Sequence, residues 1–284
     1  MKTSTTRDFR FTPAELTQWK EEGFVVRKSV FSTQEVDRLL QDGELAAKRC
    51  KEASAIDQKQ YFMYNNASGQ TMSIYAGLDH TGTAFEAMCR DPRIIDPAFQ
   101  LFGEQQYIHH CKFMNKKAFD GIAWLWHQDY GYWQGMGSVK PDMFSVMVFL
   151  DHAVPENGCL TVLPGSHKLG RLPHREDGDT GGGLTMTFLS NSTMKEVCAR
   201  IKPLPITCAP GDCIFFDCNL MHSSGHNLSP YDRRASIVAY NTDENRPGVH
   251  KGWPLVRPGR VEDILNFQTD QNWTPGPRTS TPGR

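Results

Sequence analysis

The second half of the chain is built from short apolar runs separated by turn sequences. From Tyr107 onward these runs are rich in Phe, Val and Ile, and they read YIHHCKFM, FSVMVFL, GCLTVL, CIFFD and SIVAYN. The turn sequences between them are PENG at 155–158, PGS at 164–166, DGDTGGG at 177–183 and PGD at 210–212. Apart from a short helix expected around 193–201, no long helical pattern is interleaved with these runs. The pattern excludes an alternating β/α layout and favours an antiparallel sandwich or barrel.

The beginning of the chain carries two helix start signals. Thr12 is a candidate N-cap, Pro13 occupies the first helical position, and Glu15 completes a capping box. Gly23 is expected to end this helix, and the FVV that follows reads as a short strand. The sequence STQE at 32–35 predicts a second capping box and a second helix.

These signals divide the chain into three parts within a single domain, residues 1–284. Residues 1–104 are expected to be mainly helical, and residues 105–245 are expected to form the β core. Residues 246–284 form a C-terminal extension whose Pro/Gly/Thr-rich end is expected to be a loose tail.

Composition excludes several classes of protein. With 39% hydrophobic and 22% charged residues, the chain can bury a sizeable core. Its net charge is -1 and it has no basic run, which argues against a nucleic-acid partner. The eight cysteines are scattered without a CxxC pair, so reduced and mostly buried thiols are expected. The sequence contains neither an apolar run of membrane-spanning length nor a secretory h-region, and a cytoplasmic location is expected.

The segment WLWHQDYGYW, residues 124–133, places a histidine and a carboxylate inside an aromatic block. In a strand, His127 and Asp129 would project to the same face, provided that the strand reaches Asp129 or turns just after it. Two ligands do not hold a metal ion, so a third is needed from another strand. His222 is favoured over the other histidines because it follows the apolar run CIFFD. A 2-His-1-carboxylate set with open metal positions is typical of non-haem iron(II) oxygenases.

A simpler interpretation of this motif stays open. A His-x-Asp pair often arises by chance, and a histidine in an aromatic strand is commonly a hydrogen-bonded core residue. The combination of His127, Asp129 and His222 with an arginine eleven residues after His222 favours the metal site.

Five segments resemble the phytanoyl-CoA dioxygenase family. They are the opening FTPAELTQWKEEGFVVRKSVFSTQEVDRLL, then WHQD, ENGCLTVLPGSHKLGRLPH, APGDCIFFDCNLMHSSGHNLS and SPYDRRASIVAYN, which together span residues 11–245 in the expected order. The resemblance implies a mainly β fold with flanking helices and a double-stranded β-helix (jelly-roll, cupin-like) core. It also implies iron(II), 2-oxoglutarate as cosubstrate and O2.

The resemblance assigns roles to individual residues. His127, Asp129 and His222 match the three iron ligands, and His226 would then be a loop or neighbouring residue. Arg233 matches the arginine that clamps the distal carboxylate of 2-oxoglutarate, and a guanidinium suits bidentate pairing with a carboxylate.

Three further residues near this clamp need to be weighed. Arg234 competes with Arg233, but inward alternation from Arg233 meets small or apolar residues, which favours Arg233. Ser224 matches a serine that hydrogen-bonds the same carboxylate. Asn115 is expected to contact the cosubstrate, with Lys116 as its rival.

The implied reaction is hydroxylation of an unactivated C–H bond, with release of succinate and CO2. Asp129 disfavours halogenation, because halogenating relatives carry a small residue there. Tyr130, Tyr132 and Trp133 follow Asp129, where ectoine-hydroxylase-like relatives place a substrate-contacting tryptophan. Such a cluster could hold a cationic group by cation–π attraction, or it could be core or lid packing. A small polar or zwitterionic substrate is therefore expected.

Several alternatives stay open at this point. The same chemistry on an acyl-CoA or a natural product could give desaturation, epoxidation or ring formation. A non-catalytic ligand-binding β-helix protein and a zinc hydrolase are alternatives of other classes, and Arg233 argues against the hydrolase. Residues 174–192 are a candidate lid. The oligomeric state is not predicted.

Overall fold

Two antiparallel β-sheets form the centre of the structure, a computed structural model that describes residues 8–53, 61–65, 71–177 and 186–273. The helices are α1 (Pro13–Glu22), α2 (Thr33–Ala53), α3 (Ala84–Met88), α4 (Pro92–Phe102), α5 (Asp129–Gly135), α6 (Asn191–Cys198) and α7 (Asp263–Asn266). The strands are β1 (Phe24–Arg27), β2 (Tyr61–Asn65), β3 (Thr71–Ala76), β4 (Gln106–Lys116), β5 (Trp124–His127), β6 (Met143–Phe149), β7 (Leu160–Val162), β8 (His174–Asp177), β9 (Met186–Leu189), β10 (Leu204–Pro205), β11 (Cys213–Asp217), β12 (His222–Ser224) and β13 (Arg233–Thr242).

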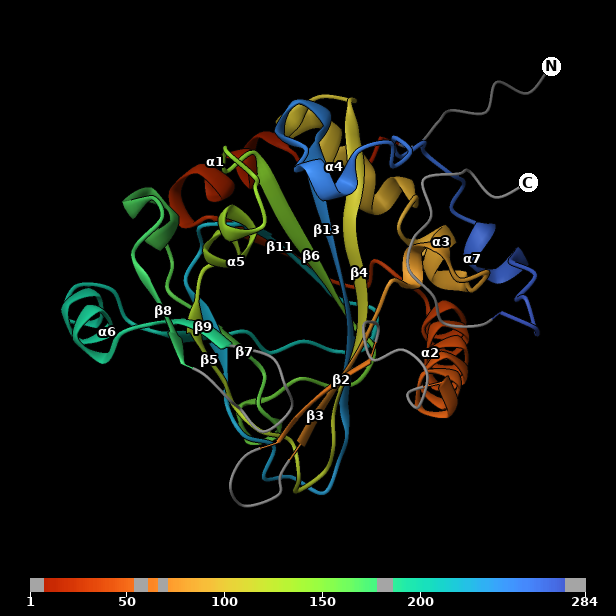
Figure 1. Cartoon of the computed structure of the whole chain (residues 1–284), viewed down its shortest axis with the longest axis horizontal. Helices are drawn as coiled ribbons and strands as arrows, with labels where there is room; N and C mark the ends of the chain where they lie inside the picture. Colours follow the sequence, from red (N-terminus) through yellow and green to blue (C-terminus); the bar gives the residue numbers. More distant parts are fainter. Residues whose placement is uncertain (1–7, 54–60, 66–70, 178–185, 274–284) are drawn as a thin grey trace.

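The strands are arranged as the jelly-roll prediction requires. The large sheet has seven strands in the order β1-β11-β6-β13-β4-β3-β2, and the small sheet has four in the order β10-β7-β12-β5. A separate hairpin pairs β8 with β9. Helices α2 and α3 lie on one side of the large sheet, and β5 and β7 lie on the other (Figure 1). The prediction of a mainly β fold with flanking helices is confirmed.

Both helix start signals are present in the structure. The Thr12 side chain accepts a hydrogen bond from the Glu15 N–H at 3.3 Å, and the Glu15 carboxylate accepts one from the Thr12 N–H at 2.8 Å. Gly23 ends α1 in the left-handed region, with φ of 81°. Ser32 and Glu35 make the same reciprocal pair before α2. Local capping chemistry therefore sets the starts of both helices.

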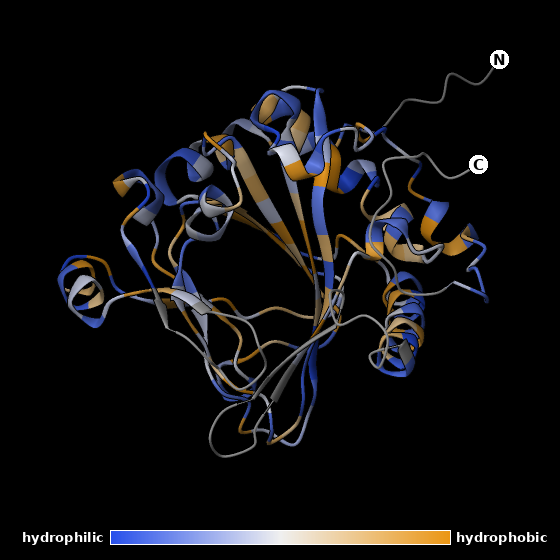
Figure 2. Cartoon of the chain, in the orientation of Figure 1, coloured by the Kyte–Doolittle hydropathy of each residue, from blue (hydrophilic) through white to orange (hydrophobic). Residues whose placement is uncertain are grey.

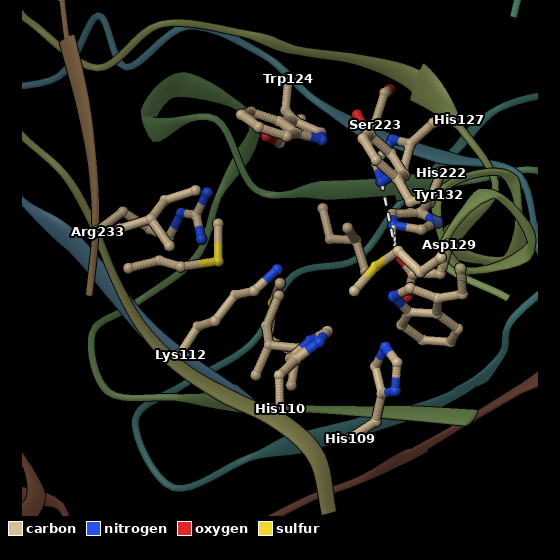
Figure 3. Close-up of a pocket in the computed structure, with 18 residues that line it drawn as sticks. His109, His110, Lys112, Trp124, His127, Asp129, Tyr132, His222, Ser223 and Arg233 are labelled. Carbon is tan, nitrogen blue, oxygen red and sulfur yellow. Dashed lines mark ion pairs between the residues drawn. The ribbon is translucent and has the colours of Figure 1, made fainter. Parts of the chain in front are cut away.

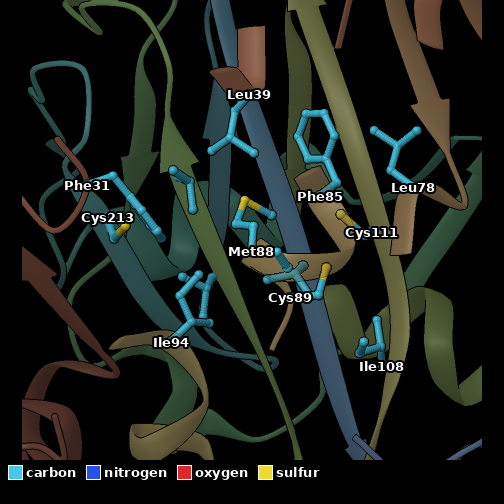
Figure 4. Packing of buried hydrophobic residues seen from close by; sticks show 14 of the residues in the cluster. Phe31, Leu39, Leu78, Phe85, Met88, Cys89, Ile94, Ile108, Cys111 and Cys213 are labelled. Atoms are coloured by element: carbon cyan, nitrogen blue, oxygen red, sulfur yellow. The ribbon is translucent and has the colours of Figure 1, made fainter. Parts of the chain in front are cut away.

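Alternation along the strands separates a helix-covered face of the large sheet from an inner face. On β13, Arg233 and Ile237 line an internal cavity, whereas Val238 belongs to the hydrophobic cluster beneath the helices. That cluster joins Leu39 of α2 and Phe85 of α3 to strand residues such as Cys111 (Figure 4). The cavity thus has a rigid, close-packed wall behind it.

Helix α2 approaches the large sheet closely because of one glycine. A Cβ atom at Gly43 would lie 2.7 Å from the Phe113 ring of β4, a separation that atoms cannot adopt. The buried apolar residues of α2 recur at helical spacing, at Val36, Leu39 and Ala46, while hydrophilic residues occur along the same helix (Figure 2).

The large sheet also takes strands from the first 104 residues. The short strand expected after Gly23 is β1, and it pairs with β11 from Phe24↔Phe216 to Arg27↔Cys213. Strands β2 and β3 extend the opposite edge through the pairing of β3 with β4. The first 104 residues therefore contribute strands to the large sheet as well as helices, which the sequence did not reveal because strand pairing over such sequence distances leaves no local signal.

Other features of the described residues agree with the sequence. The short helix expected around 193–201 is α6, Asn191–Cys198. All eight cysteines are free, and all but Cys198 are buried. No helix in the described part of the chain has the length and apolar character to cross a membrane. The centre of the candidate lid and the final eleven residues lie outside the described residues.

Candidate active site

Three side chains from separate elements converge beside the small sheet. His127 ends β5, and His222 begins β12 and pairs with His127 across the two strands. Asp129 is the first residue of α5. Its Oδ1 atom lies 3.6 Å from His127 Nε2 and 3.7 Å from His222 Nε2. One candidate ligand atom from each residue lies within 4.8 Å of the other two, which suits an ion bound at about 2.1 Å from each.

The backbone route to this arrangement differs from simple strand alternation. Strand β5 ends at His127, and the chain enters α5 at Asp129 instead of continuing extended. The Tyr130 N–H donates a 2.9 Å hydrogen bond to the Cys218 carbonyl, which anchors the helix start near the segment that leads to His222. The His-x-Asp pair therefore converges across a strand-to-helix turn.

Hydrogen bonds orient each of the three groups. His127 Nδ1 lies 2.8 Å from the Leu125 carbonyl oxygen, and His222 Nδ1 lies 2.9 Å from that of Leu220. Each Nδ1–H therefore donates to a carbonyl and leaves the Nε2 lone pair directed at the common centre. Ser145 donates to Asp129 Oδ2 at 2.7 Å and leaves Oδ1 for the centre. Such outer hydrogen bonds fix the ligand orientation in metal sites.

The charge states of these groups also suit a divalent metal. Burial, followed by the neighbouring His127, lowers the pKa of His222 to about 4. Burial raises the pKa of Asp129, but the neighbouring His127 and His222 side chains outweigh it and hold that pKa below its usual range. At neutral pH the site therefore offers an ionised carboxylate and an uncharged His222 imidazole, the forms that bind metal.

A cavity of about 390 Å³ opens from the three groups into the space between the sheets (Figure 3). Its walls are mainly apolar and aromatic, and they include Ile74, Met114, Trp124, Met147, Leu160 and Ile237. A few polar groups in an apolar cavity are typical of a small-molecule site.

Arg233 is buried in the wall of this cavity without a counter-charge. It is 1% exposed, and its Nη2 donates to the Gly158 carbonyl at 3.2 Å. Among the described residues, its Nε and Nη1 atoms have no hydrogen-bond partner. Burial lowers the pKa of Arg233 to about 10. A buried guanidinium with two free donors is suited to a carboxylate ligand.

Arg234 lies on the other side of β13 and already has its partners. Its Nε and Nη2 bond the Asp151 carboxylate at 2.7 and 2.9 Å, and its Nη1 lies 3.3 Å from Glu44. The structure therefore brings Arg233, and not Arg234, to the cavity.

Ser224 lines the cavity, but Asn115 does not. Lys116 pairs with Arg233 across β4 and β13, and its ammonium donates to the Ser224 hydroxyl at 2.8 Å. Asn115 pairs with Arg234, and both lie on the opposite face of the sheet. The expectation that Asn115 contacts the cosubstrate is corrected, because alternation along β4 directs Lys116 to the inner side instead.

The three aromatic residues after Asp129 also divide between two faces. Tyr132 and Trp133 line the cavity, whereas Tyr130 does not. Tyr130 packs with Cys218, and its hydroxyl donates to the Ser138 carbonyl at 3.3 Å. Tyr132 and Trp133, three and four residues after Asp129, share its face of α5, whereas Tyr130, directly after Asp129, does not. Tyr130 is therefore corrected to a packing residue. His226 is exposed in a loop and does not line the cavity.

Sequence reasoning missed three polar cavity residues on β4: His109, His110 and Lys112. Alternation places His110 and Lys112 on the inner face, and a register shift between Ala239 and Tyr240 of β13 lets the adjacent His109 face the cavity too. Alternation along YIHHCKFM could have predicted that His110 and Lys112 face the cavity. The bulge that also turns His109 toward it has no signal in the sequence.

Comparison with known proteins connects this geometry to a family. Residues 19–235 match the family described as phytanoyl-CoA dioxygenase (PhyH). Ectoine dioxygenase of Sphingopyxis alaskensis is 28% identical over 268 residues, which cover 89% of this chain and 85% of the relative. L-proline trans-4-hydroxylase of Streptomyces griseoviridis is 31% identical over 179 residues, which cover 57% of this chain and 66% of the relative.

Solved structures with the same fold include EctD from S. alaskensis. The crystal structure with 2-oxoglutarate and 5-hydroxyectoine has a TM-score of 0.71 and 25% identity, and the match covers 88% of each chain. The structure with bound Fe has a TM-score of 0.72 and 24% identity, with the same coverage.

These matches and the fold define the class: the protein is an iron(II)- and 2-oxoglutarate-dependent dioxygenase that also uses O2. Within that class the chain belongs to the phytanoyl-CoA dioxygenase family, whose match extends over residues 19–235 of its 284.

Proposed function

We propose that His127, Asp129 and His222 hold the iron(II) ion and that Arg233 and Ser224 bind the distal carboxylate of 2-oxoglutarate. The observation that carries this proposal is the buried Arg233 guanidinium, which has two donors without partners among the described residues in the same cavity as the three candidate ligands. A zinc hydrolase would have no use for such a group.

Iron(II) together with 2-oxoglutarate and O2 supplies the oxidation of an unactivated C–H bond, with release of succinate and CO2. The chain's own residues orient and shield this chemistry. The Leu125 and Leu220 carbonyls keep both imidazoles turned toward the ion, and Ser145 holds the carboxylate. The apolar walls exclude water and strengthen the electrostatic contacts within the site.

The substrate that fits best is a small polar or zwitterionic molecule that becomes hydroxylated. The relatives are named for ectoine and L-proline, and the cavity of about 390 Å³ is at the small end of ligand pockets. Tyr132 and Trp133 offer aromatic faces to a cationic group. An acyl-CoA would need cationic groups for its phosphates, and the chain has net charge -1 and no basic run.

The test is a substrate screen that measures succinate formed from 2-oxoglutarate in the presence of iron(II) and O2. A panel of small amino acids and cyclic zwitterions should raise succinate formation well above the rate without substrate. An acyl-CoA that did so while the whole panel failed would contradict the substrate class. If no compound is turned over and 2-oxoglutarate does not bind, the non-catalytic alternative would be favoured.

The remaining expectations are proposals as well. We propose that residues 1–284 form one oxygenase domain and that the enzyme acts in the cytoplasm on a small molecule, without a nucleic-acid or membrane partner. The lid prediction for residues 174–192 is supported by a contact of the β8–β9 hairpin, in which the Thr187 N–H donates to the Tyr132 hydroxyl at 3.1 Å.

A further inference from the structure

Lys112 places an unpaired ammonium group in the cavity. It lies on the inner face of β4, opposite Ile237 of β13, and both residues line the cavity. Figure 3 shows its side chain extending into the cavity between Arg233 and His110. Among the described residues, its Nζ has no hydrogen-bond or ion-pair partner. Lys112 is half-buried, and a cation that faces a largely apolar cavity without a partner is costly, so an anionic ligand would stabilise this group.

The position of Lys112 separates it from the Arg233 end of the cavity. Lys116, and not Lys112, pairs with Arg233 across the strands. Lys112 lies four positions before Lys116, so at about 3.3 Å per residue its backbone is about 13 Å from the pair of Lys116 and Arg233. Burial lowers the pKa of Lys112, and the Asp129 carboxylate opposes that shift. Lys112 therefore lies within electrostatic range of the three candidate ligands, whose end of the cavity is called the metal end.

Charge balance indicates what Lys112 binds. An iron(II) ion, the Asp129 carboxylate, the two carboxylates of 2-oxoglutarate and the Arg233 guanidinium together carry no net charge. Lys116 is hydrogen-bonded to Ser224 and to the Gly225 carbonyl and does not line the cavity. The loaded site therefore leaves the Lys112 ammonium unbalanced.

The neighbouring groups do not provide the missing charge. Of the described residues that line the cavity, Asp129 is the single carboxylate. His109 and His110 lie near Lys112 on β4, and burial lowers both of their pKa values well below the usual value, so both imidazoles are uncharged at neutral pH. His109 Nδ1 is buried without a partner in the described part of the chain. This end of the cavity thus offers hydrogen-bonding nitrogens and one cation.

We propose that the substrate carries a carboxylate that pairs with Lys112 at the metal end of the cavity. This inference rests on the proposed function and narrows its substrate class to small carboxylic acids. Tyr132 packs against His127 and Trp133 against His110, so both lie at the same end and accommodate the rest of the molecule, including a cationic nitrogen in a zwitterion.

The experiment compares acids with their carboxamides on the loaded enzyme. Full-length protein with iron(II) and 2-oxoglutarate is titrated without oxygen with L-proline, ectoine and the carboxamide of each, and binding is followed by the change in the visible charge-transfer band. At least one acid should bind about tenfold or more tightly than its amide. Lys112→Gln should weaken binding of that acid by about 30-fold or more, because it removes one partner of a desolvated charge pair.

Two variants serve as controls. Lys112→Arg retains the charge and should keep the preference for acids. Lys117→Gln changes an exposed lysine just beyond β4 and should leave acid affinity within twofold. In Lys112→Gln, the affinity for 2-oxoglutarate should stay within about threefold, which also shows that the variant is folded.

Three results would overturn the inference while leaving the proposed function standing. They are equal binding of acids and amides, no binding of either acid, and a loss of 2-oxoglutarate affinity in Lys112→Gln as large as the loss for the acid. The last result would assign Lys112 to the cosubstrate. Failure of the charge-transfer band to form in the wild-type protein would instead contradict the proposed function itself.

Discussion

At the scale of single residues, neighbouring arginines illustrate how burial and pairing decide function. Arg233 and Arg234 are adjacent and chemically identical, yet one is buried with free donors and the other is bonded to Asp151 and Glu44. The difference follows from strand alternation, which directs consecutive side chains to opposite faces. It makes the two residues a matched pair for experiment.

Replacement of Arg233 by alanine should weaken 2-oxoglutarate binding by at least about 30-fold, because a desolvated charge pair loses one partner. Arg234→Ala removes a half-exposed ion pair and should leave that affinity within about twofold. The dissociation constant of 2-oxoglutarate in the presence of iron(II) checks both variants. The opposite ranking would move the clamp to Arg234.

His222 should make the stability of the metal-free protein depend on pH. Its pKa is about 4 in the folded protein and about 6.5 when unfolded, so between these values the unfolded chain binds the extra proton. Its contribution to stability is complete above pH 6.5 and decreases as the pH falls toward 4. From pH 7.5 to pH 5 the free energy of unfolding should therefore fall by about 2 kcal/mol more in the wild type than in His222→Gln. Chemical denaturation without metal measures this, and equal losses in both proteins would contradict it.

At the scale of secondary-structure elements, Gln128 connects three segments, and it lies between the two candidate ligands of the His-x-Asp motif. Gln128 is fully buried. Its side-chain amide donates to the carbonyls of Gly170 and Asn219 at 2.8 and 2.7 Å, and its carbonyl accepts from the Leu172 N–H at 2.8 Å. It therefore fixes the turn between β5 and α5 against the segments that lead to β8 and β12.

Gln128→Ala should destabilise the protein by about 3 kcal/mol, because it leaves buried backbone groups without partners. It should also weaken iron(II) binding, since the segments that carry His127 and His222 lose their connection. Gln134→Ala, on the exposed side of α5, should change stability by less than about 0.5 kcal/mol. Unfolding free energies and iron affinities check the pair, and equal effects of the two substitutions would exclude this role for Gln128.

The same elements explain what the sequence could and could not predict about the site. The sequence predicted that His127, Asp129, His222 and Arg233 lie at one site from their motifs and from strand alternation, and the structure places all four at one cavity. Tyr130 was placed wrongly because an aromatic run gave no sign that a helix begins at Asp129. Asn115 was chosen over Lys116 because the sequence does not reveal which face of β4 meets Arg233.

At the scale of the whole molecule, the cavity depends on a β-sheet stiffened by its helical layer. Turn signals and strand-length apolar runs predicted the antiparallel core, and capping boxes predicted α1 and α2. The joining of β1, β2 and β3 to that sheet could not be predicted, because it rests on contacts between residues far apart in the chain. Arg93 of α4 connects two helices of this layer, because its guanidinium bonds Glu35 of α2 and Asp91, the N-cap of α4, at 2.6 Å each.

Arg93→Ala should lower the free energy of unfolding by about 3–5 kcal/mol, because it leaves two buried carboxylates without their partner. Lys48→Ala, which removes an exposed pair with Glu52 on α2, should cost less than about 1 kcal/mol. Thermal or denaturant unfolding measures both variants. A loss below 1 kcal/mol for Arg93→Ala would show that the network does not hold the layers together.

The most direct measurement of the central claim is an anaerobic titration of the purified protein with iron(II) and 2-oxoglutarate, followed by visible absorption. The account predicts a weak charge-transfer band that appears only when both are present, with one iron per chain, and that is lost in Asp129→Ala. A wild-type protein that forms no such band, or an Asp129→Ala variant that forms it with unchanged affinity, would contradict the assignment of the three ligands.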